Sequence, residues 1–214
     1  MQALLWDNDG VLVDTEPLYF RATQEILAGA GVELDEAQYI EVSLRRGESL
    51  FKLAEQYGTA PEDVEKLRDA RNARYAEMVA SDVTVLDGVV ECLQALHGRL
   101  PMAIVTSSLR KAFDSIHQDI GLMQYFEFAL TTGDYKHHKP HPEPFLRAAE
   151  RLGVAPEQCV VVEDSERGLE SAMRAGMRCL VIPNRLTRGF AFEGAHAVLD
   201  SARDVVAQID RMLT

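Results

Sequence analysis

The sequence predicts an α/β protein in which a helical segment is inserted into a parallel β-sheet domain. Two observations indicate this fold. Short apolar runs alternate with amphipathic helical patterns over residues 82–214, as in a parallel sheet that helices cover on both faces. An apolar run at 3–7 precedes residues 15–81, which show helical periodicity and no convincing strand. We therefore expect a sheet domain of residues 1–14 and 82–214, interrupted after its first strand by residues 15–81.

The inserted segment is expected to form a bundle of four short helices. A first helix covers roughly residues 17–28, and Asp35 can cap a short helix that follows it. Residues 50–57 place apolar side chains at the i, i+3, i+4 and i+7 positions of one helix face. A longer helix is expected just after Pro61, because proline suits the first turn of a helix.

The rest of the chain alternates between expected strands and helices. The expected strands cover residues 3–7, 102–105, 126–130, 159–164 and 178–182. Helical apolar faces lie at residues 89–96, from about 110, and at 145–152, 169–176 and 205–212. This alternation predicts a Rossmann-like parallel sheet core that closes around the inserted helices.

The composition limits the functions that the chain can have. Of its 214 residues, 47% are hydrophobic and 26% are charged, and the formal net charge is −12. Such an acidic chain is poorly suited to bind nucleic acid or an anionic membrane. No stretch approaches the length of a membrane span, and no leader is evident. Cys92, Cys159 and Cys179 are scattered along the chain, so we expect reduced core cysteines in a cytoplasmic protein.

Polar side chains follow the expected strands at their carboxyl ends, where open parallel sheets bind ligands. These side chains are Asp7 and Asp9 after the first strand, Thr106 and Ser107 after "MAIV", and Glu163 and Asp164 after "CVVV". Lys139, in the loop after residues 126–130, can reach the same edge. The convergence of these residues predicts a site there.

The residue types indicate the chemistry of this site. Four carboxylates in one crevice require a cation, and hard oxygen ligands without histidine or cysteine favour Mg²⁺. Lys139 and the groups near Thr106 add positive potential, which suits phosphoryl transfer. One carboxylate can act as a nucleophile, and a second one two residues later can protonate a leaving oxygen and then activate water.

Each of these features also has a simpler interpretation. Asp7 and Asp9 are common turn formers. Thr106 can cap the helix that follows "MAIV". Asp164 or Ser165 can cap the helix that follows "CVVV".

Four segments resemble the motifs of the haloacid dehalogenase-like hydrolase superfamily. They are "WDNDGVLVDTE", "IVTSS", "KPHPEPF" and "VVVEDSERGLESAMRAGM", which occur in the order and spacing of that superfamily. The helical insert resembles the all-helical cap domain of the subgroup that contains phosphoglycolate phosphatase and beta-phosphoglucomutase. The resemblance covers nearly the whole chain and implies the fold of this superfamily.

The resemblance also implies roles for the site residues. Asp7 resembles the nucleophile and Asp9 the general acid/base, while Thr106 and Lys139 resemble the residues that bind the phosphoryl group. The implied Mg²⁺ ligands are the carboxylates of Asp7 and Asp164, the backbone carbonyl of Asp9, and Glu163 in or near the ligand set. Ser107 and Asn8 are expected to offer backbone N–H groups.

The cap decides between a phosphatase and a hexose phosphate mutase. Dehalogenases and phosphonatases of the superfamily lack the second aspartate, so Asp9 argues against both activities. Arg46 and Lys52 match a stretch of the mutase and are candidate substrate-binding residues. However, the mutase has a histidine where this chain has Tyr19 and a lysine where it has Glu77. These departures favour a phosphatase.

We therefore expect a Mg²⁺-dependent phosphatase that acts on a small phosphorylated metabolite, such as a sugar or organic acid phosphate, through an aspartyl phosphate. A beta-phosphoglucomutase-like enzyme is the alternative within this superfamily. A receiver-like phospho-acceptor domain uses similar residues, but a helical insert of roughly 65 residues far exceeds an ordinary loop. The sequence does not predict an oligomeric state.

Overall fold

A computed structural model describes residues 1–213 of the chain, which divide into two compact units. The sheet unit comprises Met1–Asp14 and the chain from Thr84 onward, and the helical unit comprises Thr15–Val83. The expected boundary after residue 81 lies two residues before the end of the helical unit.

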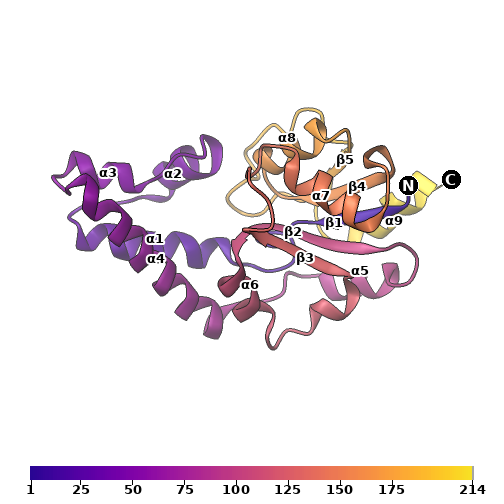
Figure 1. Cartoon of the computed structure of the whole chain (residues 1–214), viewed down its shortest axis with the longest axis horizontal. Coiled ribbons are helices and arrows are strands. Elements are labelled where there is room, and N and C mark those ends of the chain that lie inside the picture. Colours follow the sequence, from indigo (N-terminus) through magenta and orange to yellow (C-terminus); the bar gives the residue numbers. More distant parts are fainter. Residues whose placement is uncertain (214) are drawn as a thin grey trace. The chain divides into compact units, whose positions relative to one another are not determined.

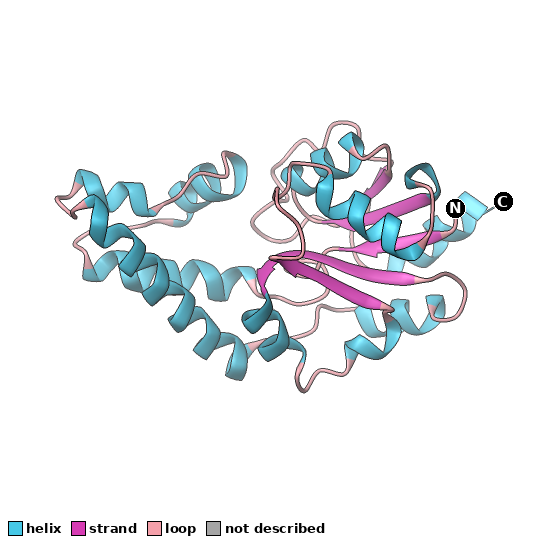
Figure 2. Ribbon diagram, in the orientation of Figure 1, coloured by secondary structure: helices cyan, strands magenta, loops and turns pink. Residues whose placement is uncertain are grey.

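The sheet unit contains a fully parallel six-stranded sheet, which confirms the predicted α/β class (Figure 2). Its strands are β1 (Ala3–Trp6), β2 (Met102–Leu109), β3 (Phe128–Thr132), β4 (Cys159–Glu163), β5 (Arg178–Val181) and β6 (Ala197–Val198). They lie side by side in the order β3-β2-β1-β4-β5-β6. β2 extends beyond the predicted residues 102–105. Its polar end pairs with β3 again at Leu109, after a shift in the register between the two strands. The short edge strand β6 was not predicted.

Helices cover both faces of this sheet (Figure 1). They are α5 (Val89–Leu96), α6 (Arg110–His117), α7 (Glu143–Leu152), α8 (Glu166–Arg174) and α9 (Arg203–Leu213), with 3₁₀ turns at Leu122–Tyr125 and Pro156–Gln158. The main apolar core lies between the sheet and α5, α6 and α9, where Trp6, Leu93 and Phe113 are buried together. α7 packs on β1 and β2, and α8 packs on β4 and β5.

The helical unit consists of α1 (Glu16–Gly29), α2 (Glu36–Tyr39), a π-helical segment (Ile40–Arg45), α3 (Phe51–Gln56) and α4 (Pro61–Asp82). α1 packs along α4, and α3 packs against α4. Asp35 caps α2 as predicted, because its side chain accepts a hydrogen bond from the Gln38 N–H at 2.7 Å. The π-helical segment was not predicted.

The order of the strands reverses around β1. This reversal determines where the polar residues at the carboxyl ends of the strands meet. β1 lies between β2 and β4, so the ends of β1 and β4 are adjacent at the point where the winding changes direction. The chain leaves the sheet unit at Asp14 and returns beside it at Thr84, whose carbonyl accepts the Asp14 N–H at 2.9 Å. The helical unit is therefore inserted directly after the residues that follow β1.

All three cysteines are free and buried, as the sequence predicted. Within residues 1–213, no helix combines the length and the apolar character that crossing a membrane requires.

Candidate active site

Three buried carboxylates meet where the ends of β1 and β4 lie side by side. Asp7 directly follows β1, and its N–H donates a hydrogen bond to the Val162 carbonyl at 2.9 Å. Glu163 ends β4 and Asp164 follows it. One carboxylate oxygen from each of the three lies within 4.8 Å of the others, and all three residues are buried. The predicted convergence of these residues is therefore present.

Lys139 supplies a positive charge within this cluster. Its Nζ donates to Asp7 Oδ1 at 2.7 Å, to Glu163 Oε1 at 2.6 Å and to the Val105 carbonyl at 2.9 Å. The lysine is buried, and its three donors have three acceptors. Arg167 in turn donates to the Lys139 carbonyl at 2.5 Å, which fixes the loop that carries the lysine.

The second oxygen of Glu163 is bound to the start of α8. Oε2 accepts the N–H of Asp164 at 3.0 Å, the N–H of Ser165 at 3.3 Å and the Ser165 hydroxyl at 2.9 Å. Ser165 caps α8, because its Oγ accepts the Gly168 N–H at 3.1 Å. Glu163 therefore connects Lys139 to the helix terminus, and both of its oxygens have protein donors.

The electrostatics of the cluster follow from burial and from these contacts. Burial raises the pKa of Asp7, Lys139 lowers it, and the nearby carboxylates of Glu163 and Asp9 raise it further. Burial opposes the charge of Lys139, but the carboxylates of Asp7 and Glu163 together outweigh burial and raise its pKa. The carboxylates outnumber the lysine, so an additional cation would stabilise their charged forms.

Asp9 faces the end of β2. Its Oδ2 accepts the hydroxyl of Thr106 at 2.8 Å and the hydroxyl of Ser108 at 2.8 Å. Thr106 Oγ1 also accepts the Ser108 N–H at 3.0 Å, while the Thr106 carbonyl accepts the Tyr135 hydroxyl at 2.7 Å. The interpretation of Thr106 as a helix cap is wrong, because α6 begins after Leu109 and has no side-chain cap.

Two glycines allow the chain to approach these carboxylates closely. Gly10 has a φ of +79°, and a Cβ at this position would lie 2.2 Å from Asp164 Oδ2. A Cβ on Gly168 would lie 1.8 Å from the Glu163 carboxyl carbon. The glycine in the first turn of α8 thus makes room for the carboxylate that holds Lys139.

Sequence reasoning missed two polar residues at this edge of the sheet. Ser108 shares Asp9 with Thr106, and Asn184 donates to Asp164 Oδ2 at 2.5 Å. Asn184 follows the end of β5, so the rule that located the other residues could also have found it. Its side-chain oxygen accepts the N–H of Leu186 at 2.7 Å, which fixes the amide toward Asp164.

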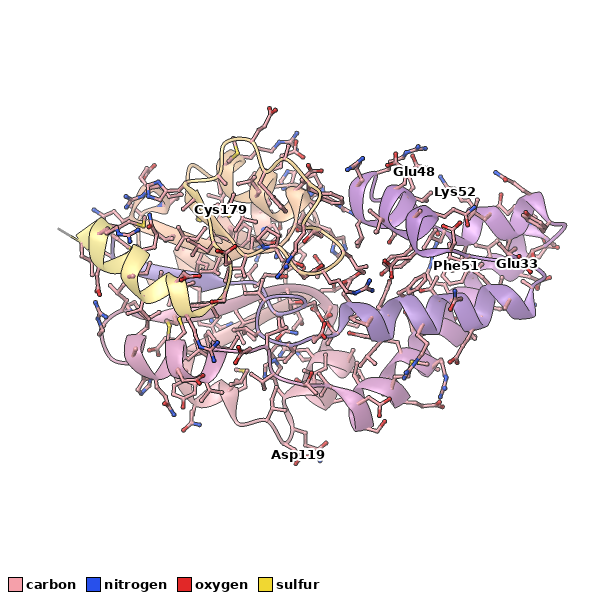
Figure 3. All side chains as sticks on the ribbon, turned by 180° about the vertical axis from the view of Figure 1, so that it is seen from behind. Glu33, Glu48, Phe51, Lys52, Asp119 and Cys179 are labelled. Atoms are coloured by element: carbon pink, nitrogen blue, oxygen red, sulfur yellow. The ribbon has the colours of Figure 1, made fainter. Side chains whose placement is uncertain are left out.

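The remaining predicted residues lie outside the carboxylate cluster. Ser107 is exposed beside Thr106, and its carbonyl accepts the Thr132 hydroxyl at 2.7 Å. Arg46 belongs to the helical unit and pairs with Glu41 at 2.9 Å. Lys52 lies on α3 of the same unit and is exposed (Figure 3). Within residues 1–213, the Lys52 side chain makes no ion pair or hydrogen bond.

Residues 4–182 match the family model of the haloacid dehalogenase-like hydrolases. The chain belongs to this family. The match covers all of the predicted site residues, and the carboxylate cluster lies inside it. Members of the haloacid dehalogenase-like family generally use a divalent metal, and the three clustered carboxylates offer a set of hard oxygen ligands for one.

Several similar proteins are named as phosphatases. The chain is 33% identical over 177 residues to the fructose-1-phosphate phosphatase YqaB of Escherichia coli, which covers 81% of this chain and 92% of YqaB. It is 32% identical over 205 residues to a phosphorylated carbohydrates phosphatase of Thermotoga maritima, covering 92% and 93% of the two chains. The crystal structure of CbbY from Rhodobacter sphaeroides in complex with phosphate aligns with a TM-score of 0.82, at 26% identity over 98% of this chain and 99% of CbbY. This haloacid dehalogenase-like chain is a phosphoric monoester hydrolase.

Proposed function

We propose that this haloacid dehalogenase-like phosphatase hydrolyses a small phosphorylated sugar, with Mg²⁺ as its metal and Asp7 as its nucleophile. The observation that carries the proposal is the buried contact of Asp7 with Lys139, at 2.7 Å, where β1 and β4 end. The names of the relatives in Escherichia coli and Thermotoga maritima support the substrate class, since both act on phosphorylated carbohydrates. The family assignment as a hydrolase decides against a receiver-like domain.

In the proposed first step, a carboxylate oxygen of Asp7 attacks the phosphorus atom. The bond from phosphorus to the sugar oxygen breaks, and the phosphoryl group is transferred to Asp7. Lys139 fixes the attacking carboxylate through Oδ1 and supplies positive charge beside the transferred group. Positioning and charge neutralisation provide most of the catalysis of phosphoryl transfer.

Asp9 is proposed to move the protons. As an acid it gives a proton to the sugar oxygen as that oxygen leaves, and as a base it takes a proton from the water that attacks the phosphorylated Asp7. The hydroxyls of Thr106 and Ser108 orient its carboxylate in the structure described here. The hydroxyl of Thr106 and the N–H of Ser107 are proposed to bind the phosphoryl oxygens.

The donor set fits Mg²⁺, because it consists of carboxylates and contains no histidine or cysteine. Asp7 and Asp164 are the side chains proposed to hold the ion, together with the Asp9 carbonyl. The ion would neutralise the carboxylates and the charge of the substrate phosphate. Glu163 is the less suitable ligand of the cluster, because protein donors occupy both of its oxygens.

We propose that the helical unit is a cap that determines substrate choice, with the predicted borders of residues 15–81. Arg46 and Lys52 are its candidate substrate-binding residues. Lys52→Ala should raise KM for the sugar phosphate several-fold, because the variant loses a contact with the polar sugar. KM for a small aryl phosphate should not change, because its aryl group offers no polar group for Lys52 to bind. Equal effects on both substrates would contradict this role.

A cytoplasmic location remains a prediction from the reduced cysteines.

The proposed function is tested by screening the purified protein with Mg²⁺ against a panel of phosphorylated metabolites, with phosphate release as the measurement. We expect sugar phosphates to be the best substrates, and we expect Asp7→Asn to lower kcat by about 10³-fold or more, because it removes the nucleophile. Full activity of Asp7→Asn would show that this assignment is wrong. Isomerisation of glucose phosphates faster than phosphate release would instead identify a mutase.

A further inference from the structure

A buried amide–imidazole pair connects the segment that carries the proposed catalytic aspartates to α6. Asn8 is fully buried between Asp7 and Asp9 in sequence, and its Oδ1 lies 2.7 Å from Nε2 of His117 on α6. The imidazole also lies against the Phe113 ring, with centroids 4.2 Å apart. The resemblance to the family implies only a backbone role for Asn8, and the contact of its side chain with His117 is an additional observation.

Stability alone does not account for the pair. Within residues 1–213, three buried side-chain atoms have no hydrogen-bond partner among the groups of the protein: Trp6 Nε1, Asn8 Nδ2 and His117 Nδ1. A buried polar atom without a partner destabilises a fold, whereas apolar side chains of similar shape at both positions are often neutral or stabilising. The pair therefore imposes a cost in a region where the neighbouring side chains form the apolar core.

The pair fixes the segment that carries both aspartates. The Asn8 carbonyl accepts the N–H groups of Val11, Leu12 and Val13, at 3.3, 2.9 and 3.2 Å. The backbone of Asn8 thus anchors the turn after Asp9, and its side chain anchors the segment to α6. A rotation of Asn8 would move Asp7 and Asp9 together, because the two residues flank it in the chain.

The direction of the hydrogen bond follows from the state of the imidazole. Burial lowers the pKa of His117 to about 4, although the charges of Asp9 and Asp114 oppose the shift. The ring is therefore neutral at pH 7 and carries one N–H. An amide oxygen can only accept, so with Oδ1 facing the ring this proton lies on Nε2.

We propose that His117 is a positioning residue, which holds Asn8 through the Nε2–H donor and thereby fixes Asp7 and Asp9 in the geometry for phosphoryl transfer. The proposal rests on the roles assigned above to these two aspartates. It predicts that His117 acts on the rate of the chemical step rather than on substrate binding. Small displacements of a reacting group are enough to lower that rate greatly.

The test compares His117→Gln with His117→Asn, which are matched in polarity. The amide nitrogen of glutamine can take the place of Nε2 and donate to Asn8, whereas that of asparagine reaches only the position of Nδ1. We expect kcat within about threefold of wild type for the glutamine variant and a loss of about tenfold or more for asparagine, with KM unchanged in both. His97→Gln, on the surface of the same unit, should leave both constants unchanged.

A second pair of variants separates positioning from folding. His117→Phe removes the donor and keeps an aromatic ring, so it should lower kcat at least tenfold. It also leaves Asn8 Oδ1 buried without a partner and should lower the melting temperature, so kcat is measured well below the temperature at which the variant unfolds. Adding Asn8→Leu to this variant should cause little further loss, because two residues that act as one unit give non-additive effects.

Several results would overturn the proposal. They are wild-type kcat in His117→Asn, equal losses in the asparagine and glutamine variants, or a change confined to KM. The comparison uses variants that retain Asp7, so it is independent of the nucleophile assignment. If Asp7→Asn remained fully active, the proposed mechanism would fail whatever the His117 variants showed.

Discussion

At the scale of single residues, the site depends on one buried cation among carboxylates. Lys139 donates to Asp7 and Glu163 and is itself almost fully covered. Removing one partner of a buried ion pair leaves an uncompensated charge in a region of low dielectric constant, and that loss is larger than any loss at the surface. In the proposed mechanism, the same side chain therefore contributes to both stability and chemistry.

We expect Lys139→Met to lower the free energy of unfolding by about 3–5 kcal/mol in the presence of a chelator, because Asp7 and Glu163 then lose their shared cation. The matched control is Lys66→Met. Lys66 pairs with Asp63 on the surface with a side chain that is 77% exposed, so its loss should change stability by less than about 0.5 kcal/mol. Urea unfolding measures both values, and equal effects would refute the buried-cation interpretation.

His117 should make stability depend on pH. The unfolded chain binds a proton at this histidine below its ordinary pKa of 6.5, whereas the folded protein binds it only near 4. Stability from this group is therefore complete above pH 6.5 and is lost as the pH falls toward 4. Between pH 7 and pH 5, wild type should lose about 2 kcal/mol more than His117→Gln in urea titrations. An identical loss in both proteins would show that the imidazole does not titrate in this way.

At the scale of elements, the junction of β4 and α8 organises the site. Glu163 ends the strand, Ser165 caps the helix, and Gly168 leaves the space into which the Glu163 carboxylate fits. The N–H groups at the start of α8 donate to the same carboxylate that holds Lys139. The helix terminus and the buried lysine are thus coupled through one side chain.

Gly168→Ala should therefore impair both folding and catalysis. Its Cβ would lie within 2.1 Å of three atoms of the Glu163 carboxylate, so this carboxylate would have to leave Lys139. We expect a loss of about 1–3 kcal/mol in stability together with a lower kcat. Gly189→Ala is the control, since no heavy atom lies within 4 Å of its Cβ and its φ is not positive. If Gly168→Ala changed stability and kcat no more than Gly189→Ala does, the close approach of Gly168 to the Glu163 carboxylate would be incorrect.

At the scale of the whole molecule, the strand order determines which polar ends can meet. Asp7 and Asp164 are more than 150 positions apart in the chain, but β1 and β4 are adjacent strands. The order β3-β2-β1-β4-β5-β6 places the reversal of winding between them. The sequence separation of these two carboxylates is thus unrelated to their distance in the fold.

Mg²⁺ should stabilise the protein as well as activate it, because its proposed site forms only when the carboxyl ends of β1 and β4 lie side by side. After treatment with a chelator we expect activity to be lost, and we expect added Mg²⁺ to raise the melting temperature by several degrees. Asp164→Asn should abolish most of that shift, whereas Asp119→Asn, at an exposed position shown in Figure 3, should retain it. A shift of equal size in both variants would place the metal elsewhere.

The sequence by itself predicted the parallel sheet, because alternating buried strands and amphipathic helices have few other stable arrangements. It also located Asp7, Asp9, Thr106, Lys139 and Asp164 near one edge, since the carboxyl ends of parallel strands point the same way. Local patterns were sufficient for these predictions. Local hydrogen bonding was likewise enough to predict the Asp35 cap.

Only the tertiary structure decided which side chains touch. Ser108 and Asn184 belong to the site because they contact Asp9 and Asp164, respectively. Glu163 is bound by Lys139 and by the start of α8. The Asn8–His117 pair joins residues 109 positions apart, so no local periodicity could reveal it. The physical reason is that hydrogen bonds act over about 3 Å in space, whereas sequence patterns report only which face of a local element is buried.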